Sequence, residues 1–343
     1  MYVFTESIVP MERRIAEDEK MSSLLVWIID EEWADYEVEK KLLKERLPEA
    51  EIRYSGYNYE KDLEEFGYRA DLILAQVYTA IDEKVMNRLE RCKGIAVYGG
   101  GYDRIDVEAA KKKGIMVTNV QGYCADDLAE YVMAAIYNYN KKILCYRSTD
   151  GKGAWGAGAV PKIVHRVSAS TLFIVGCGTI GKRVAKYAIG AGMRVIGYDK
   201  NIPSEELKRA GIEAVSWEEG FEQADYVSVH VKYTKETHHI IGKDEFSLMK
   251  QTAYLINTAR GGILNEDELL EAVRNKEIAG ATVDVISVEP PKGDEDIWNC
   301  PDIIVTPHIS YISEESFHAL KVRTVENALK MLHGEKPDDL VNG

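Results

Sequence analysis

The stretch TLFIVGCGTIG, residues 171–181, decides the fold of this chain. Its first five residues form a short apolar run, three glycines follow at the spacing G-x-G-x-x-G, and residues 182–189 continue with helical character. A wholly apolar run of this length indicates a strand buried on both faces of a parallel sheet. The stretch therefore predicts a buried strand, a tight turn and a helix, in that order.

The three glycines predict a site for a dinucleotide. Gly176 permits the sharp turn, Gly178 lets a pyrophosphate approach the backbone, and Gly181 lets the helix pack closely on the strand. Backbone N–H groups near Thr179 and Ile180, at the start of the helix, face the anion. A glycine-rich turn without a ligand is the alternative, and the flanking strand and helix favour the dinucleotide.

An acid at the end of the next predicted strand indicates which dinucleotide is bound. Residues 193–198 form that strand, and Asp199 follows, 18 residues past Gly181. A carboxylate at this point accepts both ribose hydroxyls of the adenosine and repels a 2′-phosphate. The expected cofactor is NAD rather than NADP.

The overall composition is that of a soluble globular protein. A chain of 343 residues predicts two domains, and 45% hydrophobic with 29% charged residues is an ordinary balance. The net charge of −14 argues against binding to nucleic acid or to an anionic membrane. An anionic substrate would need a locally positive site.

Cysteine usage and the N-terminal residues predict a cytoplasmic protein. The five cysteines are far apart and His residues do not cluster, so neither disulfides nor a metal site is expected. No apolar run approaches 18 residues, and the charged residues among the first 20 exclude a signal peptide. Cys177, near a helix N-terminus, carries a separate hypothesis: a lowered thiol pKa, and oxidation that blocks the cofactor.

Alternating strands and helices predict a parallel α/β sheet in the first part of the chain. The role of residues 1–21, a leader of mixed charge, stays open. The expected strands are residues 24–29, 51–54, 72–77, 94–98 and 115–119, and the expected helices are 33–47, 82–91 and 107–113.

A long helix, residues 125–146, predicts the crossover to a second α/β unit. Its strands are expected at residues 171–175, 193–198, 226–231, 253–257, 281–285 and 303–306, and helices at 182–189, 244–249 and 266–274. Ser313 caps a final helix of about 20 residues that Gly334 ends. The simplest packing returns this helix to the first domain.

The fold class that follows is α/β, with two parallel-sheet domains, Rossmann-like or flavodoxin-like, and a cleft between them. Residues 22–122 and 313–343 form a discontinuous substrate-binding domain in this assignment. Residues 123–312 form the NAD-binding domain.

Arg260, Glu289 and His308 follow successive strands of the second unit, where open α/β sheets place their ligands. Arginine binds a carboxylate by a two-pronged contact. Histidine exchanges a proton near neutral pH, and an adjacent carboxylate favours its protonated form. This set suits the reduction of a 2-oxo acid, with hydride from NADH and a proton from the imidazole. Taken one at a time, each residue also has a purely structural interpretation. Arg260 could be a surface turn residue, Glu289 a solvated acid and His308 a core histidine.

The same residues carry a family resemblance. NTARGG at 257–262, GATVDV at 280–285 with Glu289-Pro290, and TPHI at 306–309 resemble the signatures of D-isomer-specific 2-hydroxyacid dehydrogenases. The resemblance spans about residues 22–335. Residues 310–315 are similar to the branch that contains the C-terminal-binding-protein corepressors.

The resemblance implies a role for each matching residue. Arg260, Glu289 and His308 form the catalytic trio, Asp284 meets the nicotinamide carboxamide and Asp199 the adenosine ribose. The remaining cofactor contacts are implied at Gly176, Gly178, Thr179, Ile180, Gly181, His230, Val231, Thr258 and Ala259. Substrate contacts are implied at the amides of Gly100 and Gly101, at Arg260, and at Tyr78 and Tyr311. For Tyr78, Tyr98 and Tyr102, ordinary packing is an equal alternative to a role in the pocket.

NAD-dependent reduction of a 2-oxo acid to the D-2-hydroxy acid, and its reverse, is the function that the resemblance implies. A homodimer and a cleft that closes also follow from it. The alternatives are a dinucleotide-sensing scaffold similar to the corepressors, and oxidation of phosphoglycerate or phosphite. The sequence does not identify the acid.

Overall fold

The structure is a computed structural model, and it describes residues 23–142, 155–159 and 164–343. The chain divides into two compact units, Met1–Gln121 with His318–Gly343 and Gly122–Phe317. The predicted leader, residues 1–21, lies outside the described residues, as does the end of the predicted crossover helix, residues 143–146. Each unit is an α/β structure with one parallel sheet, so the predicted fold class is confirmed.

The first unit has a five-stranded parallel sheet in the order β2-β1-β3-β4-β5. Its strands are β1 (Leu25–Ile29), β2 (Glu51–Ser55), β3 (Leu72–Gln76), β4 (Gly94–Tyr98) and β5 (Met116–Thr118). Its helices are α2 (Glu37–Arg46), α3 (Glu60–Glu65), α4 (Glu83–Arg88) and α5 (Val107–Lys113), with a 3-10 turn at Gly67–Arg69. Every residue of β1, β3 and β4 is buried, as expected of strands covered on both faces.

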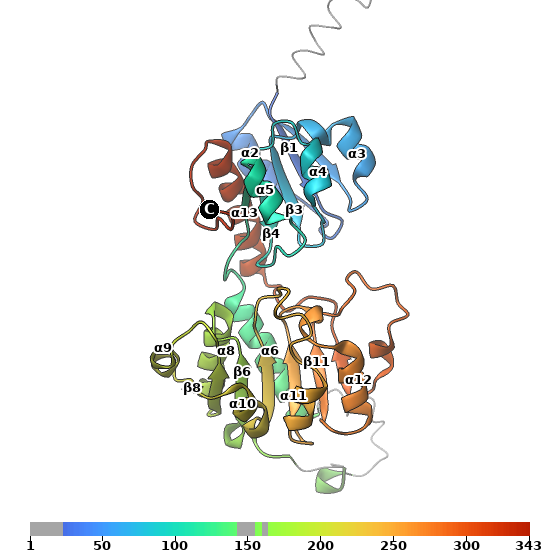
Figure 1. The fold of residues 1–343 in the computed structure, drawn as a ribbon, viewed down its shortest axis with the longest axis vertical. Coiled ribbons are helices and arrows are strands. Elements are labelled where there is room, and N and C mark those ends of the chain that lie inside the picture. The colour runs from blue at the N-terminus through green and yellow to red at the C-terminus, as the bar shows by residue number, and fades with distance from the viewer. Residues whose placement is uncertain (1–22, 143–154, 160–163) are drawn as a thin grey trace, which may run out of the picture. The chain divides into compact units, whose positions relative to one another are not determined.

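The terminal helix α13 (Glu314–Leu332) belongs to this first unit from His318 onward (Figure 1). A Cβ on Gly94 would lie 2.6 Å from the sulfur of Met331, so the helix packs directly on β4. As predicted, Ser313 caps the helix, because its Oγ accepts the N–H of Ser316 at 3.1 Å. Gly334, with φ +72°, follows the helix in the left-handed conformation that commonly ends helices.

The second unit has a seven-stranded parallel sheet in the order β12-β11-β10-β9-β6-β7-β8. The strands are β6 (Thr171–Val175), β7 (Arg194–Tyr198), β8 (Glu213–Ala214), β9 (Tyr226–Val229), β10 (Tyr254–Asn257), β11 (Gly280–Val283) and β12 (Ile303–Val305). The chain leaves β6 towards β7 and later returns to its other side with β9. This reversal is the switch point at which such sheets bind ligands.

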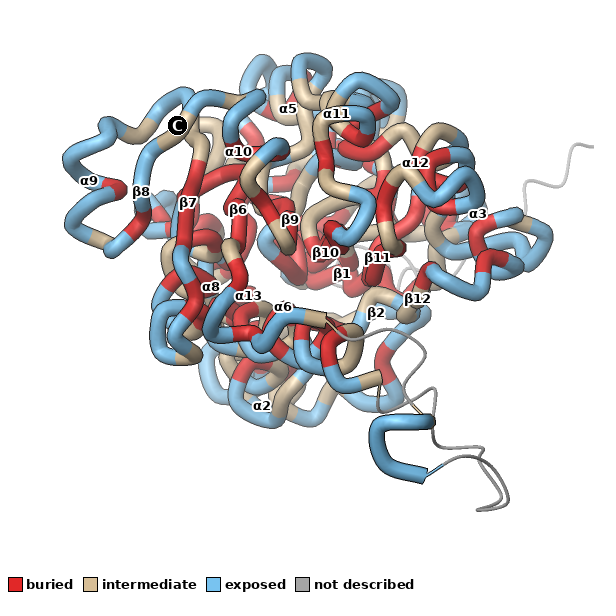
Figure 2. The backbone as a smooth tube through the Cα atoms, turned by 90° about the horizontal axis from the view of Figure 1, so that it is seen from below, coloured by how far each residue is buried: buried red, intermediate tan, exposed pale blue. Residues whose placement is uncertain are grey.

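Helices cover both faces of the second sheet. One face packs on α6 (Ala125–Lys141) and α8 (Thr179–Gly190). The other packs on α10 (Trp217–Gln223), α11 (Lys243–Leu248) and α12 (Glu266–Arg274), while α9 (Ser204–Arg209) leads to β8. Short 3-10 turns lie at Gly156–Ala159, Val167–Ala169, Gly261–Ile263 and Asp296–Asn299. Figure 2 shows the result, with buried strands inside and the outer sides of the helices exposed.

Several short elements were not predicted, and the first helix begins later than expected. Missing from the prediction are α3, α9, α10 and β8, of two to seven residues each. The first helix begins at Glu37 rather than Trp33 because Asp30 fixes a turn there. Its carboxylate accepts the N–H groups of Glu32 at 2.8 Å and Trp33 at 3.1 Å.

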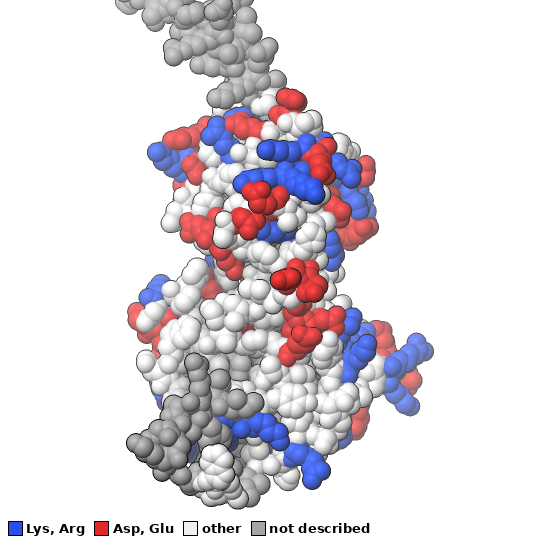
Figure 3. All heavy atoms as spheres, turned by 180° about the vertical axis from the view of Figure 1, so that it is seen from behind, with Lys and Arg blue, Asp and Glu red and all other residues white. Residues whose placement is uncertain are grey.

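Charged side chains are unevenly distributed on the face drawn in Figure 3. Lys and Arg alternate with Asp and Glu over the first unit, while a broad area of the second unit is uncharged.

Candidate active site

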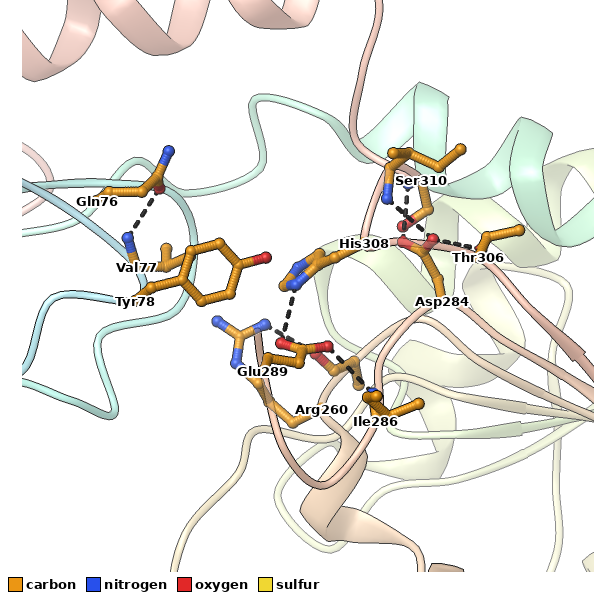
Figure 4. A network of polar contacts seen from close by, with 12 residues as sticks. Gln76, Val77, Tyr78, Arg260, Asp284, Ile286, Glu289, Thr306, His308 and Ser310 are labelled. Atoms are coloured by element: carbon orange, nitrogen blue, oxygen red, sulfur yellow. Dashed lines mark hydrogen bonds and ion pairs between the residues drawn. The ribbon is translucent and has the colours of Figure 1, made fainter. Parts of the chain in front are cut away.

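Three adjacent strands of the second unit carry the predicted catalytic residues. β10, β11 and β12 are neighbours in the sheet and run parallel, so their carboxyl ends meet at one edge. Arg260 follows β10, Glu289 lies in the segment after β11, and His308 follows β12. Figure 4 shows the three side chains pointing toward one another.

His308 and Glu289 form a hydrogen-bonded pair. Nδ1 of His308 lies 3.1 Å from Oε2 of Glu289, and both side chains are 15% exposed. With Nδ1 as the donor, the Glu289 carboxylate accepts its hydrogen. Oε1 of Glu289 accepts the N–H of Ile286 at 3.1 Å, which fixes the carboxylate in turn. The imidazole is thus oriented through Nδ1, leaving Nε2 as the nitrogen that can act on a bound molecule.

Arg260 lies in a turn that Asn257 organises. Asn257, wholly buried at the end of β10, donates from Nδ2 to the Arg260 carbonyl at 2.9 Å. Its Oδ1 accepts the N–H of Ala259 at 3.0 Å. Nη1 of Arg260 donates to the Ala259 carbonyl at 2.8 Å, so the guanidinium folds back over its own turn. A positive charge is therefore held beside the histidine pair.

Asp284, the first residue after β11, is 1% exposed and holds the segment that carries His308. Oδ1 accepts the hydroxyl of Thr306 at 2.5 Å and the N–H of Ile309 at 2.9 Å. Oδ2 accepts the N–H of Ser310 at 2.8 Å. The Asp284 carbonyl accepts the N–H of His308 at 2.9 Å. The predicted contact of Asp284 with nicotinamide stays a prediction.

The glycine loop has the turn at Gly176 and the close packing at Gly181 that the sequence predicted. Gly176 has φ +91°, and a Cβ there would lie 2.8 Å from the backbone of His230 and Val231. A Cβ on Gly181 would lie 2.2 Å from the Gly176 carbonyl oxygen. Around Gly178, by contrast, a Cβ would meet no heavy atom of the described chain within 4 Å. Neighbouring backbone atoms leave no room for a side chain at Gly176 and Gly181, whereas the space around Gly178 is open.

Asp199 stands beside this loop at the end of β7. Its Oδ2 accepts the N–H of Cys177 at 2.9 Å and its Oδ1 accepts the N–H of Asn201 at 2.8 Å. These bonds hold a half-buried carboxylate next to the glycine turn. A carboxylate in this place has acceptor sites left for ribose hydroxyls.

The residues present fit a dinucleotide. Helix α8 begins at Thr179, and its first N–H groups point out of the helix towards the open space at Gly178. Thr258, after β10, is 8% exposed, and its buried hydroxyl has no hydrogen-bond partner among the described residues. Buried hydroxyls usually have a partner, and a bound molecule would supply one.

The hypothesis of a reactive Cys177 is wrong. The thiol is wholly buried and turns away from the loop, towards the carbonyl oxygens of Ile174 at 3.7 Å and Tyr198 at 3.9 Å. Burial, with a smaller contribution from Asp199, raises its pKa to about 12. The loss of solvation raises the thiol pKa by more than the helix N-terminus would lower it, so the thiol stays protonated and unreactive.

The remaining predicted substrate residues lie in the first unit. Gly100 and Gly101 follow β4, where Asn119 Nδ2 donates to the Gly100 carbonyl at 2.7 Å. Tyr78 lies two residues past β3, and the Arg104 guanidinium lies 5.9 Å from the centre of its ring. Tyr98 is 1% exposed and packs edge-on against Trp33, as the packing alternative requires. Tyr102 is half-buried and packs against the core of the unit.

Three residues near the predicted catalytic trio, Tyr123, Tyr131 and Thr306, escaped or only partly entered the sequence prediction. Tyr311, a predicted substrate contact, lies edge-on to His308 with ring centres 6.1 Å apart, and Tyr123 lies 6.3 Å from Tyr311. The hydroxyl of Tyr131, on α6, bonds to that of Thr306. No spacing in the sequence singles out Tyr123 or Tyr131. Thr306 was visible only as part of a family motif.

The described residues contain neither a candidate metal site nor a candidate membrane span. No three His, Cys, Asp or Glu side chains among them could together hold a metal ion. In the same residues, no helix has both the length and the apolar character needed to cross a membrane.

Comparison with known proteins gives consistent matches. The family described as "D-isomer specific 2-hydroxyacid dehydrogenase, NAD binding domain" matches residues 133–310. A glyoxylate reductase of Korarchaeum cryptofilum is 34% identical over 274 residues, 79% of this chain and 82% of that protein. A D-3-phosphoglycerate dehydrogenase of Methanocaldococcus jannaschii is 35% identical over 303 residues, 88% of this chain but 57% of that protein. Among solved structures, a D-lactate dehydrogenase from Aquifex aeolicus with NAD and lactic acid has a TM-score of 0.80 and 29% identity, covering 93% of this chain and 99% of that one.

Proposed function

Since the chain belongs to the D-isomer-specific 2-hydroxyacid dehydrogenase family, an oxidoreductase family that uses NAD, we propose that it reduces a 2-oxo acid to the D-2-hydroxy acid. The observation that carries this proposal is the His308–Glu289 pair at 3.1 Å, beside Arg260 at the end of the adjacent strand. This reduction requires a proton donor, a residue that stabilises the charged form of that donor, and a group that binds the substrate carboxylate.

The residues of the glycine loop and its neighbours would hold the cofactor. When bound, NADH supplies the hydride. In this proposal the amides of Thr179 and Ile180 bind the pyrophosphate and Asp199 binds the adenosine ribose. The further proposed contacts are Gly176, Gly178, Gly181, His230, Val231, Thr258, Ala259 and Asp284.

His308 is the proposed general acid. As the carbonyl carbon gains a hydride, its oxygen gains a proton, which His308 gives up from Nε2. Glu289 holds Nδ1 and stabilises the charged imidazole before the transfer. In the reverse direction His308 takes the hydroxyl proton, so the same pair serves the oxidation.

Arg260 is the proposed anchor of the substrate carboxylate. Its guanidinium offers donors in a planar fork that matches a carboxylate, and it lies beside the proton donor. The amides of Gly100 and Gly101, with Tyr78 of the first unit and Tyr311 of the second, complete the set of proposed substrate contacts. A small 2-oxo acid such as glyoxylate or hydroxypyruvate is the first choice, because relatives of this chain are named glyoxylate reductase and glycerate dehydrogenase.

The decisive test measures oxidation of NADH and of NADPH with glyoxylate, hydroxypyruvate, pyruvate, and branched and aromatic 2-oxo acids, with 3-phosphoglycerate in the reverse direction. We expect NADH-dependent reduction of at least one 2-oxo acid. His308→Gln should lower kcat by at least about a thousandfold and Glu289→Gln by about tenfold or more, with the Kd of NADH nearly unchanged. Absence of turnover with every acid, or full activity of His308→Gln, would overturn the proposal.

Two further properties belong to the same proposal. We expect a homodimer, as the resemblance implied, and a cytoplasmic location, as the cysteine usage and the N-terminal residues predicted. Light scattering after gel filtration would report twice the chain mass of 38.6 kDa, and a single chain mass would contradict the dimer.

A further inference from the structure

The segment from Thr306 to Ser310 wraps around Asp284 (Figure 4). The Thr306 hydroxyl and the N–H groups of Ile309 and Ser310 donate to its carboxylate, at 2.5, 2.9 and 2.8 Å. The N–H of His308 donates to its carbonyl at 2.9 Å. The remaining residue of the segment, Pro307, has no N–H to donate. Four of five consecutive residues are thus fixed on one acid.

The direction of the hydrogen bonds extends this arrangement to helix α6. The Thr306 hydroxyl gives its single hydrogen to Oδ1 of Asp284. The Thr306 oxygen is then left to accept, and Tyr131 donates to it. Burial raises the pKa of Tyr131 to about 12, which keeps its hydroxyl protonated. An ordered chain of donors therefore runs from α6 to Asp284.

His308 itself has an unusual backbone conformation. Its φ is +54°, in the left-handed region that residues other than glycine seldom adopt. Its N–H lies 2.9 Å from the Asp284 carbonyl oxygen and 3.0 Å from that of Thr306. Such a conformation persists only where the surroundings impose it. The bonds to Asp284 supply that constraint, and the direction of the imidazole towards Glu289 depends on it.

We propose that Tyr131 and Thr306 are positioning residues for His308, which act through Asp284 to hold the His308 backbone and so aim the imidazole at Glu289 and the substrate. This inference rests on the proposed function, in which His308 is the general acid. It adds two residues to the predicted catalytic trio, and it gives the Asp284 carboxylate a role towards its own chain besides the predicted one towards nicotinamide.

Four variants test the proposal in the full chain. Tyr131→Phe removes only the terminal donor, and Thr306→Val removes the middle link at nearly constant volume. Thr306→Ser keeps a hydroxyl at this position and should retain the kcat that Thr306→Val loses. Tyr139→Phe is the matched control, because its hydroxyl lies on the same helix but donates to the Thr252 carbonyl at 3.4 Å, away from residues 306–310.

The kinetic readouts separate positioning from general loss of structure. A misaligned acid slows the chemical step, so kcat should fall about threefold or more in Tyr131→Phe and about tenfold or more in Thr306→Val. The isotope effect with NADH deuterated at the transferred position should rise, while the Kd of NADH and the KM of the 2-oxo acid stay within about twofold. A merely unstable variant would lose active molecules without changing the isotope effect. Thr306→Ser and Tyr139→Phe should resemble the unsubstituted protein.

A second readout does not depend on turnover. The imidazole NMR signals of His308, identified by their loss in His308→Gln, should shift in Tyr131→Phe and Thr306→Val but not in Tyr139→Phe. If the protein reduces no 2-oxo acid, the proposed function fails while these signals still decide the positioning. Unchanged His308 signals would overturn it. So would unchanged kcat and isotope effect in an active protein, or a loss of NADH affinity that accounts for the whole effect.

Discussion

Gly261 lies directly against Ile286, since a Cβ on Gly261 would come within 2.0 Å of the Ile286 carbonyl carbon and oxygen. The turn after β10, which carries Arg260, therefore packs on the segment after β11. That segment holds Glu289 through the N–H of Ile286. The absence of a side chain at Gly261 thus lets the turn of Arg260 and the segment of Glu289 lie in contact.

Gly261→Ala should damage activity more than stability. Its φ is not in the left-handed region, so only the lack of space opposes the methyl group, and the two segments must separate. We expect kcat/KM to fall about a hundredfold, because misplacement by about 1 Å has that effect. The Tm should fall by a few degrees, as overpacking costs about 1–3 kcal/mol. Steady-state kinetics and calorimetry measure both, and unaltered kinetics would show that the contact does not set the geometry.

Gly178→Ala should leave the fold intact and weaken the binding of NADH. Apart from its two chain neighbours, no described residue has a heavy atom within 4 Å of the added carbon, and the φ of −69° suits alanine. A pyrophosphate that approaches this backbone would meet the methyl group, so the Kd of NADH should rise about tenfold or more. Gly190→Ala is the control, since its Cβ also meets nothing described, at the far end of the same helix. Equal NADH titrations for both variants would contradict the predicted contact.

Asp199→Ala should change the choice of cofactor. Removing the carboxylate would take away the proposed acceptor for the ribose hydroxyls and a charge that would repel a 2′-phosphate. The ratio of the Kd values for NADPH and NADH should fall about tenfold or more, which corresponds to about 1.4 kcal/mol. Glu213→Ala, on β8 beside β7, removes an exposed acid as a charge control. A ratio that moves equally in both variants would assign the effect to net charge alone.

His230 should make the protein sensitive to acid. Burial lowers its pKa to about 3, and its Nε2 lies 2.8 Å from Ser228 Oγ. The unfolded chain binds a proton below about pH 6.5, whereas the folded chain binds it only near pH 3. This contribution to stability is complete above about pH 6.5 and is lost as the pH falls, by up to about 1.4 kcal/mol per pH unit.

Calorimetry between pH 7 and pH 4.5 measures this effect. The Tm of His230→Asn should fall less on acidification than the Tm of the unsubstituted protein. His333→Asn, at an exposed position, should follow the unsubstituted protein. Identical acid sensitivity of all three proteins would place the sensitive groups elsewhere.

Much of the fold was predictable because parallel strands buried on both faces have a simple signature. Residues 171–175 and 94–98 are strands, and residues 107–113 and 266–274 are helices, with the predicted bounds. The short helix α10 was missed because a single pair of turns shows little periodicity. A signal for it existed, since Ser216 and Glu219 form the capping box that their spacing permits.

The site was predictable only where chemistry coincides with strand ends. Arg260, Glu289 and His308 all follow adjacent parallel strands, so topology alone brings their segments to one edge. The direction of a side chain is not in that pattern, and Cys177 turned out to face the interior. The strand pattern also does not show which group a hydroxyl on a helix will bond to. The contact of Tyr131 with Thr306 is therefore seen only in the folded chain.

The return of α13 to the first unit has a consequence for synthesis on the ribosome. A Cβ on Gly94 would reach Met331, the Val117 amide donates to Asn342 Oδ1 at 2.9 Å, and Thr118 is bridged to Leu340. The half that is translated first therefore lacks part of its own interior until residues 318–343 emerge. The inserted half, residues 122–317, is continuous and can mature earlier, so the nascent polypeptide completes its halves in the reverse of their order of appearance.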